Sequence, residues 1–261
     1  MSLLTNFAQV TGCMDAAIGR RLLTKHNMHL NNAVDEYFSS PQLQQTAAPQ
    51  RNGGIYNSPQ VIDALFSKYA DTSDPNTMDL EGTIAYFGDM NIDVESDAEA
   101  ILAAYILESP STGVFFREKF VRNWSNINTA TIATIEDMAK YLHDAKSDSK
   151  LFNEAHKFAF KYALEDGQRK LELEDAISLW KVLYQDEFRK FAETGTPTTA
   201  TKFVNDFIEA GNSGKTQISR DEWEMSAPFF AVPLSELEKH SETAAWPVLM
   251  DDFVDFLFDR V

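Results

Sequence analysis

Carboxylates recur at four-residue intervals near the C-terminal end of the chain, at Asp251, Asp255 and Asp259. Residues that are four apart share one face of a helix, so a helix over this stretch would present these acids together. Leu249 and Phe253 fall on a different face and are suited to a core. Such an acidic face could bind the lysine and arginine side chains of a basic partner, and the alternative is an ordinary solvated helix face.

Residues that could act as nucleophiles or metal ligands do not form recognisable sets. Cys13 is the single cysteine, which excludes an internal disulfide and a cysteine-based zinc site. The five histidines form no His-Glu-x-x-His set, and the chain has no Gly-x-Ser-x-Gly elbow and no phosphate-binding glycine loop. We therefore expect no catalytic residue, no cofactor and no metal.

Two segments mimic calcium-binding loops. In residues 71–82, Pro75 stands at position five and Gly82 at position twelve, where a bidentate carboxylate is needed. Residues 211–222 end in Glu222 but begin with a glycine. We interpret both segments as EF-hand-like helix pairs without calcium, and a calcium-dependent adaptor protein is the alternative.

The charge distribution favours basic proteins as partners. The 261 residues carry a net charge of −17, although residues 1–50 contain three basic and three acidic side chains and contribute none of it. Strong acidity disfavours nucleic acid and anionic membranes. No stretch approaches the roughly 20 apolar residues of a membrane span, and the N-terminus lacks a signal-peptide pattern, so we expect a soluble intracellular protein.

Composition divides the chain into a small domain over residues 1–45, a linker over 46–58 and a larger domain over 59–261. The small domain shows helical patterns over residues 4–10, 14–25 and 30–39. The larger domain also has helical spacing, with helix starts at Ser58, Thr134 and Ser219, and Pro247 suits the first turn of the last helix. The predicted fold class is all-α.

A helix predicted over residues 98–108 is apolar nearly all round. Its small and apolar side chains recur at i, i+3, i+4 and i+7, at Ala100, Ala103, Ala104 and Leu107. Such a stripe either lets another helix approach closely or leaves a groove. The pattern alone favours close helix packing.

Residues 245–254, Ala-Trp-Pro-Val-Leu-Met-Asp-Asp-Phe-Val, resemble the signature of the defective-in-cullin-neddylation proteins, within their potentiating-neddylation (PONY) domain. Residues 32–39 are similar to the third helix of ubiquitin-associated (UBA) domains. The resemblance covers residues 60–261 and 1–45. It implies a three-helix UBA-like bundle followed by a helical domain of two lobes with EF-hand-like helix pairs.

The resemblance also implies a function. Members of this family are scaffold-type neddylation ligase subunits that carry out no covalent chemistry themselves. The expected partners are the C-terminal region of a cullin, the N-acetylated neddylation conjugating enzyme and, indirectly or weakly, the cullin RING subunit. Ubiquitin is a candidate partner of the UBA-like domain, and the expected localisation is cytoplasmic and nuclear.

Three sets of site residues follow from the resemblance. The pocket for the acetylated methionine of the conjugating enzyme corresponds to Ala100, Ala103, Ala104, Leu107, Phe115, Tyr162 and Val182. The cullin-binding acidic patch corresponds to Asp221, Ala245 and Asp251. Ubiquitin binding would involve Gly12, Cys13 and Tyr37, although Thr11 and Cys13 replace the usual methionine and aromatic residue of the UBA loop.

Overall fold

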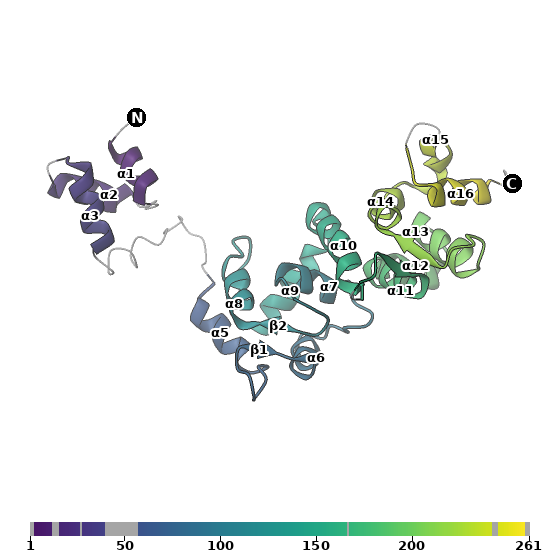
Figure 1. Cartoon of the computed structure of the whole chain (residues 1–261), viewed down its shortest axis with the longest axis horizontal. Coiled ribbons are helices and arrows are strands. Elements are labelled where there is room, and N and C mark those ends of the chain that lie inside the picture. Colours follow the sequence, from purple (N-terminus) through teal and green to yellow (C-terminus); the bar gives the residue numbers. More distant parts are fainter. Residues whose placement is uncertain are drawn as a thin grey trace. The chain divides into compact units, whose positions relative to one another are not determined.

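The computed structural model describes residues 3–11, 16–26, 28–39, 57–165, 167–241 and 245–258. The chain divides into two compact units, residues 1–56 and 57–261. Because residues 40–56 lie outside the described part, the linker boundaries drawn from composition stay a prediction. The first unit is a bundle of three helices with its own apolar cluster around Phe7 and Leu22 (Figure 1), namely α1 (Leu3–Thr11), α2 (Ala16–Lys25) and α3 (Leu30–Ser39).

Helices also dominate the second unit, and its strands are only two or three residues long. Its first half consists of α5 (Pro59–Phe66), β1 (Thr77–Met78), α6 (Leu80–Asp89), α7 (Ala98–Ile106), β2 (Phe115–Phe116), α8 (Arg117–Ser125), α9 (Ile135–Ala145) and α10 (Ser149–Ala163). Its second half consists of β3 (Lys170–Glu172), α11 (Leu173–Leu183), α12 (Gln185–Thr194), α13 (Thr199–Lys202), the π-helix η1 (Phe203–Glu209), β4 (Gln217–Ser219), α14 (Arg220–Phe230), the 3₁₀ helix η2 (Leu234–Glu236), α15 (Leu237–Ser241) and α16 (Val248–Leu257).

The short strands join helix–loop–helix units into two EF-hand-like pairs. Strand β1 pairs antiparallel with β2, with Met78 opposite Phe115, and β3 pairs antiparallel with β4, with Leu171 opposite Ile218. Each strand directly precedes a helix or is separated from it by one residue, so each sheet ties two helix starts together. The predicted helical fold class with EF-hand-like helix pairs is confirmed.

Side-chain caps explain several of the helix starts. Thr134 and Ser219 each form a reciprocal capping box with the residue three positions on, as their sequences predict. Ser58 is the N-cap of α5, but its side chain forms no cap bond. Pro247 is the N-cap of α16 with ψ of 147°, so the helix begins at Val248, one residue later than predicted, because this extended ψ keeps Pro247 outside the helix.

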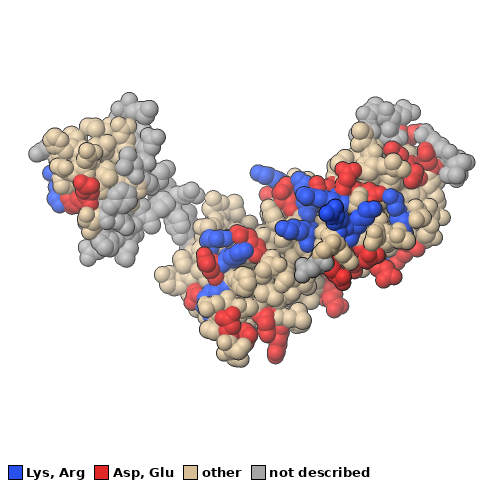
Figure 2. Space-filling model, viewed as in Figure 1, with Lys and Arg blue, Asp and Glu red and all other residues tan. Residues whose placement is uncertain are grey.

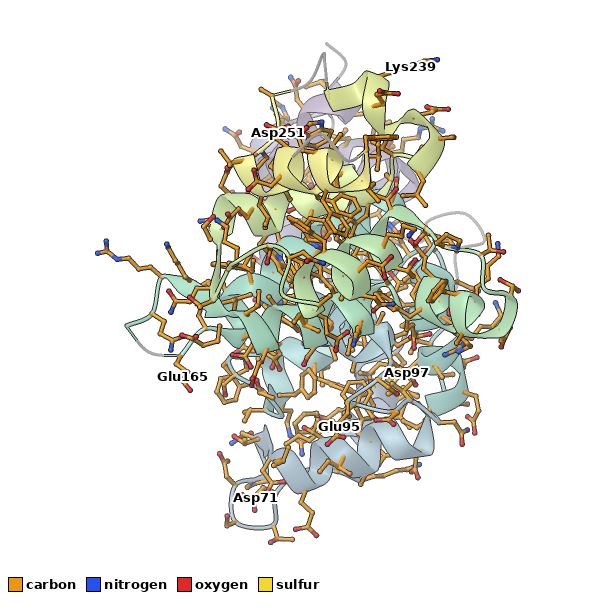
Figure 3. All side chains as sticks on the ribbon, turned by 90° about the vertical axis from the view of Figure 1, so that its right-hand side faces the viewer. Asp71, Glu95, Asp97, Glu165, Lys239 and Asp251 are labelled. Carbon is orange, nitrogen blue, oxygen red and sulfur yellow. The ribbon has the colours of Figure 1, made fainter. Side chains whose placement is uncertain are left out.

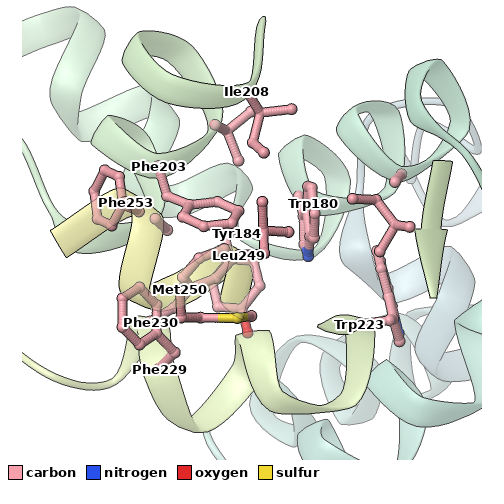
Figure 4. Packing of buried hydrophobic residues seen from close by; sticks show 14 of the residues in the cluster. Trp180, Tyr184, Phe203, Ile208, Trp223, Phe229, Phe230, Leu249, Met250 and Phe253 are labelled. Carbon is pink, nitrogen blue, oxygen red and sulfur yellow. The ribbon is translucent and has the colours of Figure 1, made fainter. Parts of the chain in front are cut away.

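Two apolar clusters define two lobes of the second unit. The first lobe, α5–α9, packs around Tyr86, Phe120 and Trp124. The second lobe, α11–α16, packs around Trp180 and Trp223, together with the aromatic residues shown in Figure 4. Helix α10 belongs to both, since Ala155 lies in the first cluster whereas Ala159 and Phe160 lie in the second.

A buried polar network lies within the second-lobe core. The rings of Trp180 and Trp223 stack at 5.4 Å, and the ring of His156 stacks on Trp223 at 4.6 Å. The indole N–H of Trp180 donates to the hydroxyl of Ser226, and this hydroxyl donates its single proton to the Trp223 carbonyl. Ser226 can therefore only accept in its 3.2 Å contact with His156, so Nε2 of His156 carries the proton. Burial lowers the pKa of His156 to about 3, so its imidazole is neutral at neutral pH.

Candidate functional site

An apolar cavity of about 340 Å³ lies on the first lobe. Helices α6 and α7 form most of its wall, and the loop between them, β2 with the two residues at 112–113, and one residue of α10 complete it. The lining residues are Leu80, Thr83, Ile84, Phe87, Val94, Glu95, Ala100, Ile101, Ala104, Thr112, Gly113, Phe115 and Tyr162. Glu95 is the one charged side chain among these lining residues, and it is exposed. The cavity is therefore suited to an uncharged, apolar ligand.

Small side chains on α7 leave the space for this cavity. Ala100 and Ala104 are four residues apart, so their methyl groups lie on one helix face. Beside them, Tyr105 of α7 packs against Phe158 of α10 at 5.7 Å, and Phe158 stacks on Tyr162 at 4.9 Å. These aromatic contacts hold α10 against α7 while the two alanines leave the cavity open.

Hydrogen bonds fix the wall formed by Tyr162. Its hydroxyl donates to the carbonyl of Ser111 at 3.1 Å and lies 3.1 Å from the hydroxyl of Ser109. Burial raises the pKa of the Tyr162 phenol above its ordinary value, so this group stays neutral at physiological pH. The ring is thereby held as an apolar wall with a fixed, uncharged polar edge.

The structure brings together four of the seven residues predicted for an acetyl-methionine pocket. Ala100, Ala104, Phe115 and Tyr162 line the cavity. The other three do not line it: Ala103 and Leu107 are buried in the first-lobe cluster, and Val182 is half-buried against the second-lobe cluster. The role of all seven residues in binding stays a prediction.

Sequence reasoning missed the wall provided by α6. Leu80 and Ile84 are four residues apart, line the cavity and are 58% and 52% exposed. Large apolar side chains that remain this exposed on one helix face often mark a binding surface. The signal in the sequence was an apolar pair outside the buried stripe that contains Tyr86 and Phe87.

The three residues predicted for an acidic docking patch are all exposed on the second lobe. Asp221 lies in the first turn of α14, Ala245 precedes Trp246, and Asp251 lies in the first turn of α16. Partial burial and the neighbouring carboxylates of Asp255 and Asp252 raise the pKa of Asp251 above its ordinary value. In Figure 3, Asp251 and Glu95 lie on different lobes, so this patch is separate from the cavity.

Packing around Phe229 holds Ala245 and Asp251 in place. The ring of Trp246 packs edge-on against Phe229 at 5.2 Å, and Phe253 of α16 lies 6.0 Å from the same ring. Asp221 is eight residues before Phe229 on α14, which corresponds to roughly 12 Å along the helix. The three predicted residues therefore lie on one lobe and are linked through α14, although no hydrogen bond or ion pair joins them directly within the described residues.

Of the three residues predicted for ubiquitin binding, only Tyr37 can be placed. Its ring packs edge-on against Phe7 at 5.8 Å, and it is buried in the core of the three-helix bundle. Gly12 and Cys13 lie outside the described residues. The structure thus assigns Tyr37 a part in the core, and its contact with ubiquitin stays a prediction.

The calcium-like loops use their own carboxylates to hold the loop backbone. Asp71 accepts hydrogen bonds from the backbone N–H and the hydroxyl of Ser73, and Asp79 caps α6 through the N–H of Gly82. Glu222 pairs with Lys215 and accepts from the N–H of Ser219. Within the part of the chain that the structure describes, no group of three His, Cys, Asp or Glu residues is arranged to hold a metal ion.

Two family models match the chain, one described as a UBA-like domain over residues 1–44 and one described as cullin binding over residues 133–256. DCN1-like protein 3 of Xenopus tropicalis is 30% identical over 81% of this chain and 67% of its own length. The chain belongs to the defective in cullin neddylation family. The protein named defective in cullin neddylation protein 1 from Candida albicans is 27% identical over 97% of this chain and 95% of its own length. The protein of the same name from Yarrowia lipolytica is 28% identical over 91% of this chain and 89% of its own length.

The family match has a clear relation to the two candidate sites. Asp221, Ala245 and Asp251 all lie inside the segment that matches the cullin-binding model. The cavity lies mostly before that segment, and Tyr162 is the lining residue inside it. None of the helices in the described ranges is long and apolar enough to cross a membrane.

Proposed function

We propose that this member of the defective in cullin neddylation family is a non-catalytic scaffold that binds a cullin and an N-acetylated neddylation conjugating enzyme together. The observation that carries the proposal is that one folded unit has two separate surfaces of different chemistry, an exposed acidic patch on the second lobe and an apolar cavity on the first. Relatives named for defective cullin neddylation and the cullin-binding family match support the choice of partners.

The cullin would bind at Asp221, Ala245 and Asp251. Partial burial and repulsion from the neighbouring carboxylates raise the pKa of Asp251, and a partner's lysine or arginine would stabilise the ionised form through charge-assisted hydrogen bonds. Ala245 would allow close approach because its side chain is a single methyl group. Val248, the first residue of α16, is 70% exposed and lies three residues before Asp251, so its side chain would add apolar contact.

The conjugating enzyme would bind at the apolar cavity. Acetylation removes the positive charge of an N-terminal methionine, and an apolar cavity could not desolvate that charge without a large cost. The methionine side chain would lie against Ala100 and Ala104, with Phe115 and the neutral Tyr162 as walls. Exposed Leu80 and Ile84 would contact the apolar residues that follow the methionine.

Binding both partners at once would promote transfer of the ubiquitin-like modifier to the cullin lysine. A scaffold of this kind raises the effective concentration of the thioester near the lysine and restricts its orientation, so no nucleophile of its own is needed. The cullin RING subunit would take part indirectly or weakly. Because cullins and the conjugating enzyme are the proposed partners, we place this activity in the cytoplasm and nucleus.

Reconstituted cullin neddylation with limiting conjugating enzyme tests the proposal. We expect the parent protein to accelerate transfer, and Asp251→Arg and Asp221→Ala to lower that acceleration by roughly tenfold, which corresponds to about 1.4 kcal/mol of binding. Glu193→Arg is the matched control for Asp251→Arg. Glu193 is exposed on α12 of the same lobe, and both substitutions replace a carboxylate with a guanidinium group. The proposal is wrong if the parent gives no acceleration, or if both patch variants match the parent.

A peptide-binding assay tests the cavity separately. A peptide with the N-terminal sequence of the conjugating enzyme should bind more tightly when its terminal methionine is acetylated, and equal affinity for the free amine would contradict the proposed site. Ala100→Phe should fill the cavity and weaken binding by about tenfold or more. Ala85→Phe, on the exposed face of α6, should leave the affinity unchanged.

A further inference from the structure

Helix α7 lies between the lobes and contacts both of them (Figure 1). Leu102 and Ala103 pack into the first-lobe cluster, whereas Ile101 packs into the second-lobe cluster. Ala100 and Ala104 face the apolar cavity. The position of this one helix therefore determines where the methyl groups of the cavity wall lie relative to Tyr162 on α10.

Glu99 provides the polar anchor of α7. Its side chain is only 8% exposed, and both of its carboxylate oxygens are used. Oε1 lies 2.9 Å from Lys146 Nζ and 3.2 Å from His143 Nδ1, at the end of α9 in the first lobe. Oε2 accepts a hydrogen bond of 3.0 Å from Gln185, the first residue of α12 in the second lobe. One carboxylate thus joins three elements.

The same network continues across the junction between the lobes. Lys146, with a side chain 13% exposed, also contacts Asp186 of α12 at 3.2 Å. Arg189 lies 3.4 Å from both Asp186 Oδ1 and Gln185 Oε1. A polar cavity of about 420 Å³ lies on the side of α7 that carries Glu99, and its lining includes Lys146, Gln185 and Arg189. The contacts between the lobes at this point are therefore ionic, in contrast with the apolar clusters above.

Burial would make this network costly if its members were not paired. Burial alone raises the pKa of Glu99, but its hydrogen bond and ion pair with Lys146, a backbone hydrogen bond and the hydrogen bond with His143 outweigh that effect and hold the pKa below its ordinary value. The carboxylate is therefore ionised at neutral pH. Buried ion pairs contribute little net stability, because desolvation offsets the attraction, yet they strongly restrict geometry. A role in positioning fits this balance better than a role in stability.

The side chain of the N-cap residue does not fix the first turn of α7. Its N-cap, Asp97, forms no side-chain cap bond, and its carboxylate instead accepts from the N–H of Asp93. Helices α6, α9 and α14 start with side-chain caps that fix their first turns. For α7 the side chain that ties the first turn to neighbouring elements is Glu99.

We propose that Glu99, paired with Lys146 and Gln185, is a positioning residue that sets α7 between the two lobes and thereby shapes the cavity for the acetylated apolar N-terminus. This inference rests on the proposed function of the cavity. Glu99 does not line the apolar cavity. Glu99 acts through Ala100 and Ala104 on the same helix. Its contacts with α9 and α12 fix α7, and α7 in turn sets the distance of the two alanines from Tyr162.

Affinity for the acetylated peptide tests this role. We expect Lys146→Met to weaken binding by about tenfold, because the paired charge that holds Glu99 is lost. Lys146→Arg restores a cation and should bind within about twofold of the parent. Lys140→Met is the matched control, since Lys140 lines the same polar cavity and is also paired, with exposed Asp144, but does not contact Glu99.

Two further measurements separate positioning from loss of stability. Leu142→Ala, in the first-lobe core, should lower the melting temperature while leaving peptide affinity close to that of the parent. Spin labels at Glu118→Cys and Glu193→Cys, with Cys13→Ser, report the distance between the lobes. Lys146→Met should broaden that distance distribution, and Lys146→Arg should not.

The outcomes distinguish the two proposals. If the parent does not prefer the acetylated peptide, the proposed function of the cavity fails. If the parent prefers it and Lys146→Met binds equally well with an unchanged distance distribution, the positioning role of Glu99 is wrong. Equal weakening by Leu142→Ala and Lys146→Met would also overturn it, because affinity would then follow stability alone.

Discussion

At the scale of single residues, Asp251 and its neighbours on α16 separate the proposed docking from the packing of the core. It lies exposed in the first turn of α16, where the helix dipole favours a carboxylate. Its pKa is nevertheless raised, by partial burial and by Asp255 and Asp252. In contrast, Leu249 and Phe253 on the same helix are fully buried in the second-lobe core. Partner binding and folding are therefore assigned to different residues of one motif.

Asp251→Asn should separate these two roles. Because the pKa of Asp251 is raised in the folded protein, the folded state binds the proton more tightly than the unfolded chain, so ionisation at neutral pH opposes folding. We expect the variant to melt within about 2 °C of the parent or above it, while its affinity for the cullin falls. Calorimetry measures both. A clear loss of thermal stability would show that Asp251 supports the fold.

His156 should make the protein sensitive to mild acid. The unfolded chain takes up a proton near the ordinary pKa of 6.5, whereas burial delays protonation in the folded state to about 3. Stability should therefore fall between these values by up to about 1.4 kcal/mol per pH unit. Urea unfolding at pH 7, 6 and 5 measures this slope.

His156→Phe should have a lower stability at neutral pH but should lack most of the slope between pH 6.5 and 5. Carboxylates held at low pKa, such as Glu99 and Glu222, lose their contribution only at lower pH, below the ordinary value of 4.5. His143→Gln is the control, because the His143 side chain is 72% exposed. An unchanged slope in His156→Phe, or its loss in His143→Gln, would contradict the assignment.

At the scale of elements, local rules predicted helix starts better than they predicted which way a helix faces. The capping boxes at Thr134 and Ser219 depend on residues three positions apart, so the sequence contained the full signal. The sequence did not contain the full signal for the stripe on α7, because Ala103 is fully buried in the first-lobe core, whereas Ala100 is partly buried and lines the cavity, and Leu107 lies past the helix end as its C-cap. Which neighbours surround α7 depends on the tertiary fold.

The sequence contained the apolar pair on α6 without showing that it lines a cavity, and it gave no sign of the Glu99 network. In the sequence, Glu99 is a single charged residue in an apolar helix. Its partners Lys146 and Gln185 lie 47 and 86 positions later and contact it only in the folded structure. Pairings over such separations leave no periodic pattern in a single chain. The segments that carry the acidic patch were predicted, whereas the arrangement of Asp221 relative to Asp251 required the structure.

Two glycines of α6 should respond in opposite ways to alanine. A Cβ at Gly82 would lie 2.0 Å from the carbonyl oxygen of Tyr69, so Gly82→Ala must displace backbone and should cost about 1–3 kcal/mol. A Cβ at Gly88 meets nothing within 4 Å, so Gly88→Ala should stabilise by about 0.5–1 kcal/mol through helix propensity. Chemical denaturation of both variants measures the difference. Equal effects would contradict this packing of α6 against Tyr69.

At the scale of the whole molecule, each unit has the apolar cluster it needs to fold. The three-helix bundle packs around Phe7 and Leu22, and residues 57–261 pack around two clusters joined by α10. Both proposed docking surfaces belong to the larger unit. The net charge of −17 also arises outside residues 1–50. We therefore expect the smaller unit to be dispensable for the proposed bridging.

Residues 57–261 alone should keep both stability and bridging activity. We expect the truncated protein to unfold cooperatively within about 3 °C of the larger unit's transition in the full chain, and to accelerate cullin neddylation equally well at the concentration where the full chain gives its highest rate. Thermal unfolding and the reconstituted assay measure these properties. Loss of acceleration by a folded truncated protein would assign an essential part of the activity to the UBA-like unit.

Bridging by one molecule that performs no chemistry itself has a kinetic signature. The decisive measurement is the rate of modifier transfer as the concentration of this protein is raised, with the conjugating enzyme and the cullin both limiting. A bridge predicts a rate that rises and then falls, because excess scaffold binds the two partners on separate molecules. Asp251→Arg should flatten the curve. A rate that climbs to a plateau and stays there at high scaffold concentration would contradict bridging.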